Sequence, residues 1–103
     1  LEHCRTALAR MRRGIRVLGT DTEAMRAFRL ANRAMAQQRG RSEWVKNGRT
    51  GTPDTAAGRW RPFQISFMLL CLEGIVDPDH DDRGTADLLW FPTGGGKTEA
   101  YLG

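Results

Sequence analysis

The chain has 103 residues, a formal net charge of +4 and two cysteines without a disulfide or metal-binding spacing. Its longest apolar stretch, residues 65 to 72, is too short to span a bilayer, and no signal peptide is recognisable. These features argue against a secreted disulfide scaffold and a membrane protein, and predict a cytoplasmic location. Because the chain begins at Leu1 and stops just after a glycine-rich motif, we expect it to be a fragment of a longer protein.

The first part of the chain predicts two amphipathic helices. The first covers residues 2 to 18, where apolar side chains recur at helical spacing, and Gly19 is expected to end it. Thr20 and Glu23 fit a capping box at the start of the second helix, which we expect to end at Gly40. Residues 1–39 therefore predict a basic helical hairpin, and the glycine-containing residues 40–58 predict a linker.

Charge is distributed unevenly along the chain. Residues 1–61 contain fourteen Lys and Arg against five Asp and Glu, whereas residues 62–103 contain two against seven. An arginine-rich surface suits phosphate contacts, as in a protein that binds nucleic acid, whereas a solvated helix face is the other interpretation of each arginine. Five arginines lie off the apolar stripes: Arg5, Arg12, Arg16, Arg26 and Arg33.

The second part of the chain predicts a buried helix and a buried strand. Residues 62–73 have no polar stripe, and Pro62 suits the first turn of a helix that Gly74 would close. Residues 77–84 are acidic; their spacing does not fit a calcium loop, and a solvated loop is the favoured interpretation. Residues 86–91 then predict a short buried strand.

The motif that indicates chemistry follows this strand: Phe91-Pro92-Thr93-Gly94-Gly95-Gly96-Lys97-Thr98. A strand, a glycine-rich turn and a Lys-Thr pair opening a helix form a phosphate-binding loop. The glycines let backbone N–H groups point at one phosphate, and Thr93, Gly94, Gly95 and Gly96 are the predicted contacts. Lys97 is the predicted catalytic cation at the β- and γ-phosphates, and the Thr98 hydroxyl is the predicted magnesium ligand. The motif thus predicts ATP and Mg²⁺ as cofactors. The strict pattern fails at its first glycine, where Phe91 stands.

The phosphate-loop motif with Phe91 at its first position resembles the corresponding motif of superfamily 2 helicases and translocases. The upstream sequence Trp60-Arg61-Pro62-Phe63-Gln64 resembles a second motif of the same superfamily. The resemblance implies that Gln64 reads the adenine edge and that Arg61 and Trp60 flank the base. A narrower resemblance covers residues 27–37, 60–70 and 87–103. These are similar to the large helicase-like subunit of the DISARM anti-phage defence system.

The resemblance implies an α/β fold, in which an N-terminal helical segment precedes the start of a RecA-like P-loop lobe. That lobe would start at residues 59–103, with the chain ending after motif I. It implies an ATP hydrolase that acts on DNA in defence, together with other defence-system subunits, and a chain that is inactive on its own. Two alternatives stay open: a P-loop ATPase that remodels proteins, and a non-catalytic interaction scaffold with a residual phosphate loop.

Overall fold

The computed structural model describes residues 1–56, 58–92 and 94–102. In this part of the chain the regular elements are all helical: α1 (Glu2–Thr20), α2 (Thr22–Lys46), α3 (Pro62–Val76), the short 3-10 helix η1 (Asp81–Gly84) and α4 (Lys97–Leu102). No helix among these residues is long and apolar enough to cross a membrane.

The α/β fold class predicted from the sequence is wrong for this chain. The residues expected to form a strand, 86–91, run as extended chain, and no strand is present in the described residues. A strand requires a neighbouring strand to pair its backbone groups, and the chain brings none to this segment. Leu88 and Trp90 are 91% and 81% exposed instead of buried. The residues that the structure describes therefore contain no RecA-like lobe.

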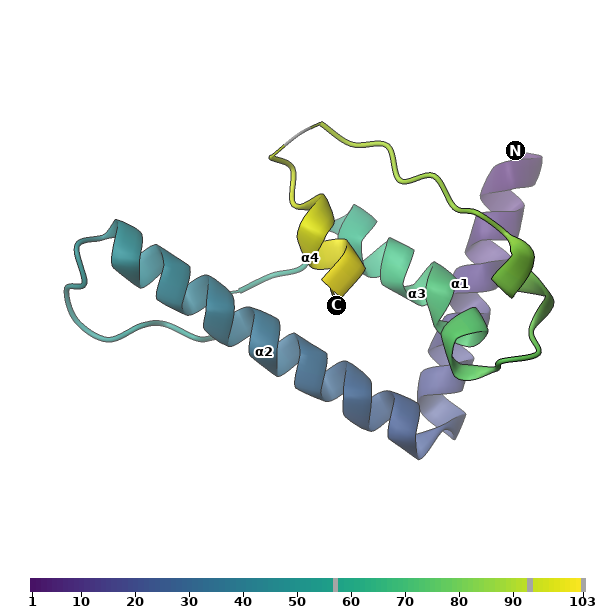
Figure 1. Ribbon diagram of the computed structural model, residues 1–103, viewed down its shortest axis with the longest axis horizontal. Helices are drawn as coiled ribbons and strands as arrows, with labels where there is room; N and C mark the ends of the chain where they lie inside the picture. The colour runs from purple at the N-terminus through teal and green to yellow at the C-terminus, as the bar shows by residue number, and fades with distance from the viewer. Residues whose placement is uncertain (57, 93, 103) are drawn as a thin grey trace.

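The two N-terminal helices exist as predicted, but their ends differ. Helix α1 continues through Gly19 to Thr20, and the N-cap of α2 is Asp21, whose side chain accepts a hydrogen bond from the Ala24 N–H at 3.0 Å. Only one residue separates the helices, and Figure 1 shows them diverging from this junction, so they do not lie side by side along their lengths. The division of the chain into domains at residues 39 and 58 stays a prediction.

Helix α2 is longer than predicted, because Gly40 lies inside it. A side chain at Gly40 would collide with the backbone of Asp54, so the glycine allows the following segment to cross the helix closely. The indole of Trp44 donates to the Gly51 carbonyl at 2.9 Å. The indole of Trp60 donates to the Asn32 side chain at 2.7 Å. Residues 47–56 and 58–61 therefore return along α2 toward the start of α3.

Helix α3 lies between α1 and α4 (Figure 1). It begins at Pro62 as predicted and continues past Gly74 to Val76. Gly14 of α1 is buried against it, because a Cβ at this position would overlap the Leu69 carbonyl oxygen. At the other face Phe63 stacks on Phe91, with ring centroids 4.1 Å apart. Helix α3 thus takes part in the packing of both α1 and the segment around Phe91.

Candidate functional site

The glycine-rich turn connects the extended segment to α4. Gly94 and Gly96 have φ angles of 82° and 93°, in the left-handed region that a side chain rarely tolerates. The Gly95 N–H donates to the Pro92 carbonyl at 3.0 Å, which closes the turn. Lys97 is the first residue of α4, as the motif predicts. Thr93, also predicted to bind phosphate, lies outside the described residues.

The start of α3 is tied directly to this turn. The Arg61 guanidinium donates to the Gly95 carbonyl at 2.8 Å, and the Gln64 amide donates to the Gly96 carbonyl at 2.8 Å. The oxygen of the same amide accepts from the Arg61 N–H at 2.7 Å, as a capping residue at the third position of a helix does. Two segments 32 to 34 residues apart in sequence are thereby held in one arrangement.

Gln64 is 6% exposed, so its amide is almost entirely enclosed by protein. Of its two N–H donors and two acceptor lone pairs, one of each bonds to the chain itself. One donor and one lone pair stay available for a ligand. The predicted recognition of adenine by Gln64 stays a prediction, while its contact with the Gly96 carbonyl is an additional role that the sequence did not indicate.

A cavity of about 730 Å³ lies beside the turn, within the size range of small-molecule sites. Three segments surround it: the second half of α2, residues 58–64, and the turn with the start of α4. Six of the predicted site residues line it: Arg61, Gln64, Gly94, Gly96, Lys97 and Thr98. Gly95 is placed at its edge only by the hydrogen bond from Arg61. The structure therefore brings most of the predicted residues to one hollow.

The cavity also includes residues that the sequence did not single out. Arg39, Ser42 and Lys46 come from α2, and Arg59 comes from the returning segment. Sequence reasoning placed residues beyond 39 in a linker, which hid the fact that one helix face continues past Gly40. The positions of Arg39 and Lys46, seven residues apart on a helix, were the available signal.

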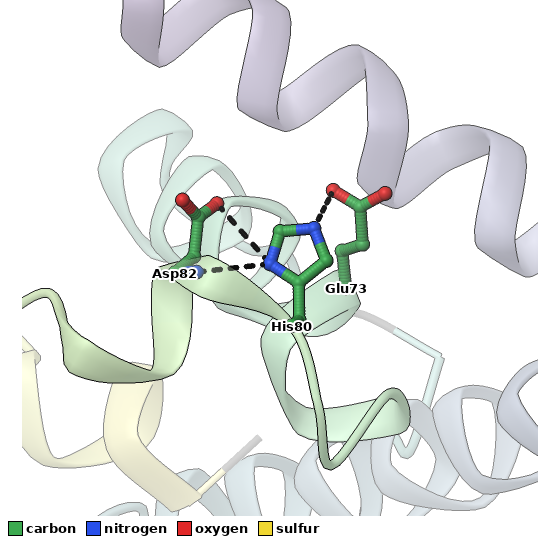
Figure 2. Close-up of side chains that lie close together, drawn as sticks. All are labelled: Glu73, His80 and Asp82. Atoms are coloured by element: carbon green, nitrogen blue, oxygen red, sulfur yellow. Dashed lines mark hydrogen bonds and ion pairs between the residues drawn. The ribbon is translucent and has the colours of Figure 1, made fainter.

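A second polar cluster lies at the far end of α3, where Glu73, His80 and Asp82 converge (Figure 2). The His80 Nδ1 accepts from the Asp82 N–H at 3.1 Å, and its Nε2 lies 3.1 Å from the Glu73 carboxylate. Arg13 of α1 donates to the same Glu73 carboxylate at 2.6 Å. Because both imidazole nitrogens and the carboxylate are already partnered, the geometry is that of a polar network joining α1 to the acidic segment.

Arg10 extends this network to the extended segment. Its guanidinium donates two hydrogen bonds to the Asp87 carboxylate, at 2.6 and 2.7 Å. This hydrogen-bonded pair lowers the pKa of Asp87 below its usual range and raises the pKa of Arg10. Asp82, from the residues expected to form a solvated acidic loop, also lies 3.3 Å from both Arg10 and Arg13, so this loop neutralises part of the basic arm. The five arginines predicted to face phosphate, in contrast, are all exposed: Arg5, Arg12, Arg16, Arg26 and Arg33.

Comparison with known proteins shows that this chain is similar to part of a much longer protein of the DISARM system. The chain is 46% identical, over an alignment of 109 residues, to the DISARM protein DrmA of Bacillus paralicheniformis (strain ATCC 9945a / NCIMB 11709 / CD-2). The alignment covers all of this chain and 10% of that protein's length. The resemblance to a DISARM subunit predicted from the sequence is confirmed. No family model matches the chain, and no solved structure matches it.

Proposed function

We propose that this chain is part of an ATP-dependent helicase or translocase that acts on DNA in anti-phage defence, and that it contributes the phosphate-binding loop. The similarity to the DISARM protein DrmA supports the defence role. The observation that carries the ATP-binding role is the cavity in which the Gly94–Gly96 turn, Lys97 and Thr98 meet Arg61 and Gln64.

The residues at this cavity fit a nucleotide bound with magnesium. Gly94 and Gly96 line the cavity, have no side chain, and adopt left-handed φ angles. Lys97 supplies a positive charge, and among the described residues no carboxylate lies within ion-pair distance of it. The Thr98 hydroxyl is the side chain that would hold Mg²⁺, an oxygen ligand of the kind this ion prefers. Magnesium, when bound, neutralises charge on the transferred phosphoryl group.

Phosphoryl transfer depends mainly on positioning and on charge stabilisation, and the residues of this chain divide those tasks. Arg61 and Gln64 hold the turn by its Gly95 and Gly96 carbonyls, which fixes the direction of the backbone. Lys97 attracts the phosphate oxygens. Other subunits of the defence system are the proposed protein partners, and DNA is the proposed polymer on which the complete protein acts.

The experiment is the Lys97→Ala change in the complete protein. We expect ATP affinity to fall at least about tenfold, because a charged contact to phosphate is lost, and ATP hydrolysis to fall to background. Isothermal titration with ATP and Mg²⁺ and a phosphate-release assay measure the two effects. Arg41→Ala removes an exposed cation that does not line the cavity and serves as the folded control. ATP turnover in Lys97→Ala equal to the wild type contradicts the proposal.

A further inference from the structure

We infer that the second half of α2 forms a cationic wall of the nucleotide site, with Arg39 and Lys46 binding the phosphate chain opposite Lys97. The inference rests on the proposed function and deepens it. It assigns ligand-binding residues to a helix that lies outside the phosphate-loop motif and outside the adenine motif.

The first argument is the charge of the cavity. Arg39, Lys46, Arg59, Arg61 and Lys97 line it, and Glu99 is the one carboxylate among the lining residues that the structure describes. The lining therefore has a net charge of +4, which equals the formal charge of the whole chain. The charges elsewhere in the chain sum to zero, so the lining of this cavity accounts for the net positive charge of the chain. A concave surface of one sign with protein walls raises the local concentration of a polyanion.

The second argument is the difference between these cations and the arginines of α1. Arg10 and Arg13 are held by the carboxylates of Asp87 and Glu73, each at 2.6 Å. Arg39 and Lys46, in contrast, share the single carboxylate of Glu43, at 3.4 and 3.6 Å. One carboxylate cannot neutralise two cations, and at these exposed positions the contact is weak. Both side chains are thus available to a multiply charged ligand.

The third argument is the way in which α2 is held in place. The Trp60 indole, itself part of the cavity lining, is fixed to Asn32 of α2 at 2.7 Å. Gly58 packs closely against α2, since a Cβ added at Gly58 would lie 3.3 Å from the Ala36 Cα. The residues just before Arg61 therefore attach α2 to the segment that holds the phosphate loop. A wall so attached keeps its cations at a constant position relative to the turn.

The test uses the complete protein carrying Arg39→Gln and Lys46→Gln together. We expect the Kd for ATP to rise roughly tenfold, since two charged contacts are lost, and the Kd for AMP to change less than about twofold. Inorganic tripolyphosphate, used as a competitor without a base, should weaken in parallel with ATP. The matched control is Arg29→Gln with Arg41→Gln, which removes two exposed arginines of the same helix that do not line the cavity. Its Kd for ATP should equal that of the wild type.

A change in the opposite direction separates binding from folding. Glu43→Gln removes the carboxylate that Arg39 and Lys46 share. We expect it to tighten ATP binding by roughly twofold to threefold, which a merely damaged helix would not do. Equal ATP affinity in the Arg39/Lys46 variant and the matched control overturns the inference, as does a loss confined to DNA affinity. If Lys97→Ala weakens ATP binding while the Arg39/Lys46 variant does not, the inference alone fails. If Lys97→Ala also binds normally, the proposed function fails.

Discussion

At the scale of single residues, the close contact between Gly96 and Gln64 requires glycine at position 96 of the turn. Gly96 has a φ of 93°, and a Cβ added there would lie 2.6 Å from the Gln64 amide nitrogen. That amide donates to the Gly96 carbonyl across the same gap. The absence of a side chain is thus required twice, once by the backbone conformation and once by the close approach of Gln64.

Gly96→Ala is therefore expected to loosen the turn. The left-handed conformation costs an L residue about 1–2 kcal/mol, and the new methyl group displaces the Gln64 amide. We expect the Kd for ATP of the complete protein to rise about tenfold, measured by isothermal titration. Gly84→Ala is the control, because no atom lies within 4 Å of the Cβ position there. Equal ATP affinities in the two variants would show that the turn does not need glycine at position 96.

At the scale of elements, the contact between α1 and α3 depends on a missing side chain. Gly14 weakens α1 as an isolated helix, because glycine costs about 1 kcal/mol relative to alanine. In the structure, Gly14 is the buried residue of α1 and faces the Leu69 carbonyl. Two polar contacts join the same two helices: Arg13 pairs with Glu73, and Arg10 donates to the Leu70 carbonyl at 3.3 Å. The residue that weakens the local helix is thus the one that permits its packing.

Two alanine substitutions in α1 separate these effects. Gly14→Ala is expected to destabilise the α1–α3 contact by about 1–3 kcal/mol, because the methyl group overpacks a closed contact. Gly19→Ala, where no atom lies within 4 Å, is expected to stabilise the helix by up to about 1 kcal/mol. Hydrogen exchange of peptides covering residues 62–76 in the complete protein measures both changes. Slower exchange in both variants would contradict the close packing at Gly14.

At the scale of the whole molecule, the chain is extended and has little interior. Its radius of gyration is 15.7 Å, against about 13 Å for a compact domain of this length. Met68 and Ala100 are the buried apolar residues in the described part of the chain, and no large side chain there is fully enclosed. Such a shape leaves long helical faces exposed, and the arginines outside the acidic network lie on them.

These exposed arginines predict the salt dependence of DNA binding by the complete protein. Arg12, Arg16 and Arg33 changed together to Gln should lower the slope of log affinity against log salt by about two to three units, because each phosphate contact releases about one counterion. The change should be similar for any DNA sequence, since phosphate contacts carry no base information. Fluorescence anisotropy at several salt concentrations measures it. An unchanged slope with a lower melting temperature would instead show that these arginines pair with protein carboxylates.

What the sequence determined by itself was the local part of the structure. Helical spacing and Pro62 predicted α1, α2 and α3, and the Gly94–Lys97 pattern predicted the turn followed by a helix. These features depend on neighbours within a few residues, where backbone geometry and side-chain periodicity act directly. The resemblance to a DISARM subunit could likewise be recognised from the amino-acid sequence.

Only the tertiary structure decided which distant residues meet. The strand expected at residues 86–91 failed, because pairing needs a partner strand that local sequence cannot supply. Gly40 was predicted to end a helix, yet Gly40 and Gly14 each lie within a helix where another backbone approaches closely. Arg10 binds Asp87, which lies 77 residues away in the sequence. Arg39 and Lys97, from different helices, line the same cavity. Contacts of this kind depend on how whole elements pack, because a side chain's charge or size does not by itself specify its partner.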